Sequence, residues 1–353
     1  MKRLSIAVVV GWSILSALST AQADITFNIS STGNASADAG FQAAAAYIQS
    51  QFDDDITINI NAGFSDLGPG ILGSAGSSRA NYTYLDFRTA VAGDVVSNDD
   101  LTFSTSIPQG NAFNVYINGT TEFSGNAYND FDGGSNNRTV RLTHANAKAL
   151  GLRSANNTAQ DVNINFSNQF TWDFDPTNGI TGGAIDFVGV AIHEIMHGMG
   201  FVSGVDTLDA NANGNINDNA FTFVSSLDFL RHSADSLNAN ADIDWTADNR
   251  AKFYSIDGGL TSGSTLGGGV NHWSRGVNNG DGRQASHWRD NLGLGIMDPT
   301  SQPAGSANVV TALDLQALDV IGWDPILLAA IPEPSSFFML AIGLGIFSQR
   351  RRV

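Results

Sequence analysis

The sequence of 353 residues predicts an α+β protein, on three observations. Segments 25–29 and 56–60 alternate apolar and polar residues as half-buried strands do, and the Ala-rich segment 35–52 between them is typical of a helix. A more apolar helix is predicted from residue 185 to His197, and Gly198 and Gly200 are expected to break it. Near the end, segment 311–321 has one apolar face and predicts a helix that packs against the rest of the domain.

Shorter elements are predicted between these segments. The pattern favours helices over 82–91 and 145–150 and strands over 112–117, 139–142 and 162–166. The connections are rich in Gly, Asn, Ser and Asp, which is typical of exposed loops.

The first 23 residues have the three parts of a secretory signal peptide. Lys2 and Arg3 precede an apolar run over 4–18, and the small-residue site Ala21-Gln22-Ala23 follows it. The alternative, an N-terminal membrane anchor, is disfavoured because the run is short and ends in a cleavable site. Export is therefore expected, with residues 1–23 removed.

The last residues have a second tripartite pattern. Pro332-Glu333-Pro334 is followed by an uncharged stretch, 335–348, and by three arginines, 350–352. The pattern resembles the PEP-CTERM sorting signal of Gram-negative bacteria. The resemblance implies that 330–353 is a sorting signal cleaved by an exosortase-type enzyme, with transient membrane contact and delivery to the outer surface or extracellular matrix. A plain tail anchor is the alternative, but the stretch is short for a bilayer that needs about 20 residues.

The composition limits the partners and the metal ligands that are expected for this chain. The formal net charge is −17, which argues against nucleic acid or anionic lipid as a partner. The chain has no cysteine, so disulfides, thiolate catalysis and cysteine-ligated zinc are excluded. Any bound metal must be held by His, Asp, Glu or water.

The predicted helix that ends near residue 197 contains the strongest chemical motif, His193-Glu194-Ile195-Met196-His197. Two histidines four residues apart lie on one helix face, so their imidazoles can bind one zinc ion. Glu194 is rotated away from both and is expected to act as general base toward a water at the metal.

A zinc site of this kind needs a third protein ligand. No glutamate occurs between Glu194 and Glu333, which excludes a glutamate on a later helix. A histidine six residues after His197 is also absent, because that position is Ser203. The candidates that remain are His287, His272 and Asp228.

The order of motifs then resembles a known family. His193 to Phe201 reads His-Glu-x-x-His-x-x-Gly-Phe; after a long insertion come Ser286-His287-Trp288 and the Met-containing turn Gly295-Ile296-Met297-Asp298-Pro299. This is similar to the leishmanolysin-type metzincins, and closer to exported metallopeptidases with PEP-CTERM tails, over about 173–323.

The resemblance implies a metzincin-like, two-lobed zinc peptidase domain with lobes over 24–200 and 201–329. It implies His287 as the third zinc ligand, Met297 beneath the metal, and a polypeptide substrate. Two departures stand out: Met196 occupies a position where the family often has a small residue, and no tyrosine follows Met297. Tyr254, the last tyrosine of the chain, is the candidate for stabilising an oxyanion.

Other readings remain open. The chain could be a surface or matrix protein with a structural metal, although Glu194 would then have no use as a base. Zinc-dependent hydrolysis of a non-peptide substrate is a third reading. The remaining histidines, His144 and His232, are expected to be structural or surface residues.

A calcium loop is also possible. Asp209, Asn211 and Asn213 stand at positions one, three and five of a loop with Gly214 at six. Position twelve, which should be acidic, is Ala220, and Asp218 would have to substitute. The alternative is a solvated Asn-rich turn.

Overall fold

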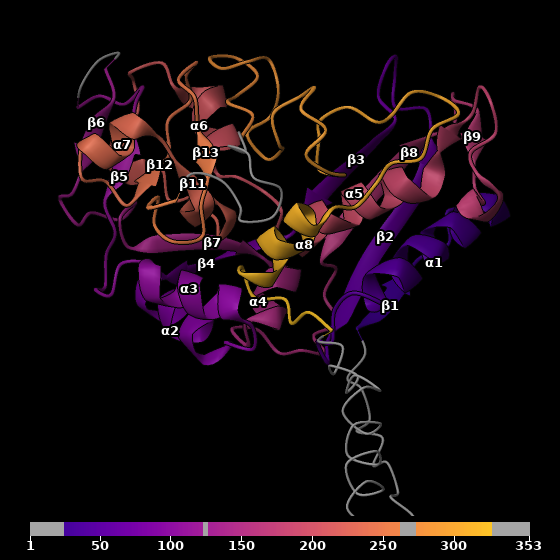
Figure 1. The fold of residues 1–353 in the computed structure, drawn as a ribbon, viewed down its shortest axis with the longest axis horizontal. Helices are drawn as coiled ribbons and strands as arrows, with labels where there is room; N and C mark the ends of the chain where they lie inside the picture. Colours follow the sequence, from indigo (N-terminus) through magenta and orange to yellow (C-terminus); the bar gives the residue numbers. More distant parts are fainter. Residues whose placement is uncertain (1–24, 123–125, 262–272, 327–353) are drawn as a thin grey trace, which may run out of the picture.

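The computed structural model describes residues 25–122, 126–261 and 273–326 (Figure 1). Within them the chain is a mixed α+β structure with several small sheets, so the α+β part of the predicted fold class is confirmed, and the metzincin-like part stays a prediction. The predicted signal peptide and sorting signal lie outside the described residues. No helix of the described segments combines the length and the apolar character needed to cross a membrane.

The largest sheet has four strands in the order β1-β2-β8-β3. Strands β1 (Thr26–Ile29), β2 (Thr57–Ser65) and β8 (Val162–Ser167) run parallel to one another. Strand β3 (Gly73–Ser77) is antiparallel to β8 and forms the edge of the sheet.

Helices α1 (Ala35–Gln49) and α5 (Phe187–Met199) pack against each other and against this sheet. Aromatic rings join the two helices to the sheet: the Phe41 ring centroid lies 5.2 Å from that of Phe166 and 5.4 Å from that of Phe187. Asn59, Asn61 and Asn163 alternate with buried apolar residues along β2 and β8, and the side-chain N–H of Asn61 donates to the side-chain oxygen of Asn163. The apolar face of the sheet therefore fixes α5 in place.

The remaining elements form smaller units, most of which lie to the left of α5 in Figure 1, whereas β9 lies at the right-hand edge. Four small sheets are built from β4 (Arg79–Thr83) with β7 (Thr139–Thr143), β5 (Val115–Ile117) with β6 (Tyr128–Asp130) and β12 (Ile243–Asp244), β11 (Arg231–His232) with β13 (Phe253–Tyr254), and β9 (Trp172–Asp173) with β10 (Ile185–Asp186). The other α-helices are α2 (Tyr84–Gly93), α3 (Asn98–Ser106), α4 (His144–Ala149), α6 (Val205–Asn211), α7 (Ala234–Asn238) and α8 (Ala312–Asp319).

Several predicted boundaries differ from the structure for identifiable reasons. The first helix ends at Gln49, and Phe52 instead bridges to Pro325. The second begins at Tyr84, because Tyr82 belongs to β4. The sequence of β3, Gly-Ser-Ala-Gly-Ser, has few residues that favour strands and did not predict one. It forms a strand because its backbone pairs with that of β8.

The division into two lobes at residue 200 stays a prediction. One pairing crosses it, because β5 precedes that residue and β12 follows it, and the two strands are hydrogen-bonded in parallel. Residues on both sides of the predicted boundary therefore share a sheet.

Candidate metal centre

Helix α5 has clear start and stop signals. The Asp186 carboxylate caps it by accepting from the Gly189 backbone N–H at 2.8 Å. The helix passes through Gly198 and ends at Gly200, whose φ of +123° lies in a region that L side chains rarely adopt. The chain therefore turns sharply just after His197.

Three imidazoles meet at one point. The Nε2 atom of His197 lies 3.1 Å from that of His193 and 3.1 Å from that of His287, and the third separation is 3.3 Å. In the described part of the chain these three residues form the one group of His, Asp and Glu side chains compact enough to hold a metal ion. His144 and His232 lie outside it.

Each imidazole is oriented by a backbone carbonyl. The Nδ1 atoms lie 2.7 Å from the Ile296 oxygen for His193, 2.6 Å from the Phe201 oxygen for His197, and 3.4 Å from the Gln284 oxygen for His287. With Nδ1–H donating to the carbonyl, Nε2 keeps its lone pair, and three lone pairs face one another. Without a shared ligand these lone pairs would repel one another.

The donor set fits zinc. Nitrogen ligands about 2.0–2.1 Å from one tetrahedral ion stand roughly 3.3 Å apart, close to the measured Nε2 separations. Burial lowers the pKa of all three histidines, that of His287 to about 3, so they are neutral as metal ligands must be. Three protein ligands leave one tetrahedral position open, which is typical of catalytic zinc.

His287 is held by neighbours from two other parts of the chain. On one side, Asp206 of α6 accepts from the Ala285 N–H at 2.6 Å and from the Ser286 hydroxyl. On the other, the Trp288 indole stacks on Trp273, with ring centroids 4.2 Å apart. The His287 backbone carbonyl also accepts from the Ser274 N–H at 3.0 Å. The loop that carries the third histidine is therefore rigidly supported although it has no regular structure.

The Met-containing turn is anchored by Asp314, the third residue of α8. Its carboxylate accepts from Ile296 N–H at 2.9 Å, Met297 N–H at 3.3 Å and the Trp288 indole N–H at 2.8 Å. The Ile296 carbonyl orients His193, and Trp288 follows His287 directly. The Asp314 carboxylate therefore helps to position both histidines. Met297 is fully buried, and the role of its sulfur beneath a metal stays a prediction.

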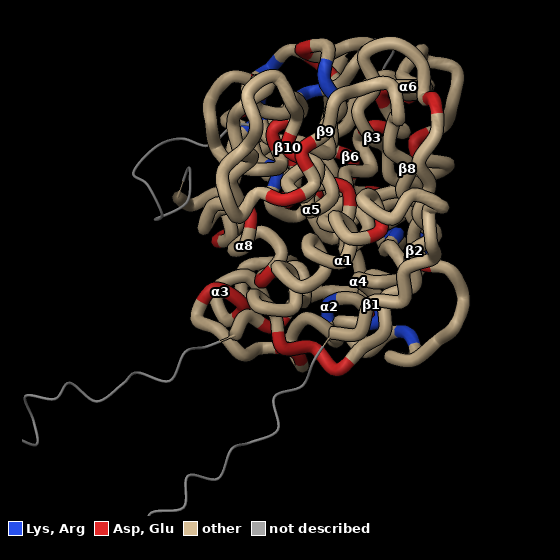
Figure 2. Tube along the Cα trace, turned by 90° about the vertical axis from the view of Figure 1, so that its right-hand side faces the viewer, with Lys and Arg blue, Asp and Glu red and all other residues tan. Residues whose placement is uncertain are grey.

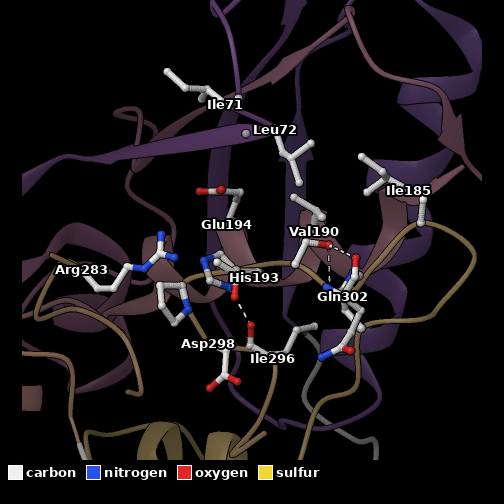
Figure 3. Close-up of a pocket in the computed structure, with 18 residues that line it drawn as sticks. Ile71, Leu72, Ile185, Val190, His193, Glu194, Arg283, Ile296, Asp298 and Gln302 are labelled. Carbon is white, nitrogen blue, oxygen red and sulfur yellow. Dashed lines mark hydrogen bonds between the residues drawn. The ribbon is translucent and has the colours of Figure 1, made fainter. Parts of the chain in front are cut away.

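Glu194 lies beside this group and faces a cavity (Figure 3). Its side chain is 7% exposed, and burial raises its pKa to about 8. Edge strand β3 runs past it so closely that a Cβ at Gly73 would come within 3.1 Å of Oε1. Glycine at this position leaves room for the carboxylate.

Two cavities flank the histidines and Glu194. One, of about 530 Å³, is lined by apolar residues that include Ile71, Leu72, Ile185, Val190 and Ile296. The other, of about 590 Å³, is more polar and is lined by residues that include Arg79, Ser203, Asp206 and His287. Both also touch Gly73, so β3 forms a common wall.

The structure separates the other candidates from this group. Tyr254 is fully buried, donates its hydroxyl to the Gln316 amide oxygen at 3.2 Å, and lines neither cavity. It therefore cannot reach an oxyanion in either. Asp228 accepts from Ser225 N–H, Gly204 N–H and the Trp245 indole, so it is a structural acceptor. His272 lies outside the described residues.

The possible calcium loop has a different local structure from the one predicted. Asp209 and Asn211 belong to helix α6, and both carboxylate oxygens of Asp209 accept from Asn278 and Asn279 backbone and amide N–H groups. Asn213 accepts from Asn215 N–H at 3.0 Å. Asp209 thus anchors the 276–279 turn, and calcium binding here stays a prediction.

Sequence reasoning did not single out Arg79, Asp206, Asp314 or Gly73. One signal was available: Thr311 followed three residues later by Asp314 is a capping-box pattern, and it is present in α8. The partners that Asp314 finds in the turn could not be foreseen, because 17 residues separate it from Met297.

Two family models match the chain. The PEP-CTERM protein-sorting motif matches residues 330–352, which confirms the predicted sorting signal and supports an exported bacterial protein handled by an exosortase-type enzyme. An SPBPB7E8-like model matches residues 135–255; it includes α5 and ends before His287, and it covers less than half of the chain. No curated protein and no solved structure matches.

Proposed function

We propose that this protein is an exported zinc metalloendopeptidase of the metzincin-like, leishmanolysin-resembling type. The observation that carries the proposal is the convergence of three Nε2 atoms within 3.1–3.3 Å, with an unpartnered carboxylate beside them. Among the described residues, no hydrogen bond holds the Glu194 carboxylate, and it lines both cavities, so it can accept a proton from a water beside the histidines.

The three histidines would hold the zinc through Nε2. Bound zinc supplies a Lewis acid that lowers the pKa of water and polarises a carbonyl group. Glu194 acts as the general base: its carboxylate accepts the proton of the attacking water and then donates it to the leaving amine nitrogen. Gly73 keeps the space that this carboxylate needs, and the Ile296, Phe201 and Gln284 carbonyls hold the imidazoles in the metal-binding tautomer.

The substrate would be an extended polypeptide. Strand β3 is the edge of its sheet and borders both cavities, so a peptide can pair with it as an added strand and pass in front of Glu194. The apolar cavity then receives a substrate side chain, and its Ile and Val lining favours an apolar one.

Export and sorting indicate where the protein would act. The signal peptide, the sorting motif and the acidic composition suit activity at the outer surface or in the matrix of a Gram-negative bacterium. Contact with a membrane would be limited to the tail, and the charge does not suit nucleic acid.

The test is cleavage of an unfolded protein by the purified protein. We expect peptide release that stops on treatment with a zinc chelator and returns with added zinc. Glu194→Gln should keep zinc at one equivalent while kcat/KM falls about 100- to 10,000-fold, the usual contribution of a general base.

The matched control is Glu122→Gln, which changes an exposed glutamate away from the histidines and should keep full activity. A wild-type protein that binds zinc and cleaves no peptide would favour the rival function, a surface protein with a structural metal. Cleavage of a non-peptide ester or amide alone would favour the third reading.

A further inference from the structure

Arg79 is a cation in the cleft, and no described carboxylate forms an ion pair with it, although the charges of Asp206 and Asp228 act on it. It is the first residue of β4, two positions after the end of β3, and it lines the polar cavity together with His197 and His287. Its charge is near enough to His197 to lower the pKa of that imidazole. No hydrogen bond or ion pair of its guanidinium is recorded within residues 25–122, 126–261 and 273–326.

Carboxylates outnumber basic side chains in this protein. Asp and Glu outnumber Lys and Arg by 34 to 17. In the described part, five basic side chains pair with carboxylates, namely Lys148, Arg250, Lys252, Arg275 and Arg283, whereas Arg79 and six other arginines form no ion pair. A partly buried charge without a partner is unfavourable, and the usual remedy is an ion pair.

The two acids that line the same cavity, Glu194 and Asp206, form no ion pair with Arg79. Asp206 accepts from the Ala285 N–H and the Ser286 hydroxyl, and the loop of His287 depends on both contacts. The Arg79 guanidinium therefore remains available to a ligand. A guanidinium presents parallel N–H groups that match the two oxygens of a carboxylate.

We infer that Arg79 is a specificity-determining residue that binds the carboxylate of an acidic side chain in the polypeptide substrate. The inference rests on the proposed function, because a peptide paired with β3 would continue toward Arg79 at the end of that strand. The enzyme would then prefer an Asp or Glu residue at one position within three residues of the scissile bond, and an apolar residue where the other cavity receives a side chain.

The test uses matched peptides that differ only by Glu or Gln at each of the three positions on either side of the bond. For the wild-type protein, we expect kcat/KM to be about 10- to 100-fold higher with Glu at one position, the effect of a charge-assisted hydrogen bond. Arg79→Gln should bring this Glu/Gln ratio close to one, Arg79→Lys should keep part of it, and Arg79→Glu should invert it.

Arg153→Gln is the control, because Arg153 lies in the loop after α4, contacts Asn157 and lines neither cavity. Zinc content shows that each variant keeps its histidine site. If the wild-type protein cleaves peptides but shows no acidic preference, or if Arg79→Gln keeps the preference, the role of Arg79 is wrong while the peptidase stands. If no peptide is cleaved, the proposed function fails and this inference with it.

Discussion

At the scale of single residues, the orientation of an imidazole decides which of its nitrogens can bind a metal. The spacing of His193 and His197 predicted that they share a helix face, which they do on α5. It did not predict that the Ile296 and Phe201 carbonyls would face their Nδ1 atoms. Those acceptors come from the turn and from the residue after Gly200, so they depend on the chain beyond the helix.

His287→Ala should bind zinc far more weakly than the wild-type protein, because two histidines and water replace three histidines. The measurement is zinc content after dialysis, with His272→Ala beside it as the rival third ligand from the sequence. Replacing a residue that lies near the metal but is not a ligand should lower zinc affinity by about 10- to 100-fold at most. Zinc retained by His287→Ala and lost from His272→Ala would reverse the assignment.

At the scale of elements, helix α8 has a role beyond the packing that its apolar face predicted. Asp314 in its first turn accepts from Thr311, Trp288, Ile296 and Met297, so the start of one helix holds the turn beside the histidines. The turn must approach closely, because a Cβ at Gly295 would come within 2.1 Å of the Asp314 carboxylate.

Asp314→Ala should lower zinc affinity about 10- to 100-fold, the scale of residues that orient ligands, although Asp314 touches none of the three imidazoles. The reason is the lost anchor of the Ile296 carbonyl, which orients His193. Competition with a chelator measures the affinity. Asp235→Ala, at an exposed acid in the first turn of α7, is the control, and equal affinities for both variants would refute this role for Asp314.

At the scale of the whole molecule, carboxylates gather where the first and last segments meet. Figure 2 shows acidic residues around α3 and the neighbouring loops. Burial, followed by the charge of Asp324, raises the pKa of Asp54 and of Asp94 to about 8. The Asp324 pKa rises to about 6 for the same main reason. The ion pairs recorded for the described residues all lie elsewhere.

These raised pKa values predict a fold that weakens as the pH rises. A carboxyl group whose pKa is higher in the folded protein favours folding fully below its unfolded value of 3.8, and this contribution is lost as the pH rises to about 8. The free energy of unfolding should therefore fall between pH 4 and pH 8 through Asp54 and Asp94.

Asp54→Asn removes one of these ionisations and keeps an acceptor for the Asp324 N–H. We expect its melting temperature to exceed that of the wild-type protein at pH 8, on the order of 2–4 °C, as about 1 kcal/mol produces in a large domain. At pH 4 the two should agree. Asp55→Asn, at the exposed neighbouring residue, is the control, and an equal rise at both pH values would contradict the explanation.

The sequence by itself determined the local features of this protein. The α+β class, most of its longer elements, the sorting signal and the pairing of His193 with His197 follow from periodicity and short motifs, because neighbours in sequence control them. Only the tertiary structure decided the rest. It brought His287 to the helix from 90 residues away, held it through Asp206 and Asp314, turned Tyr254 into the core and left Arg79 in the cleft. These are contacts between distant segments, and periodicity and short motifs do not record which distant segments will meet.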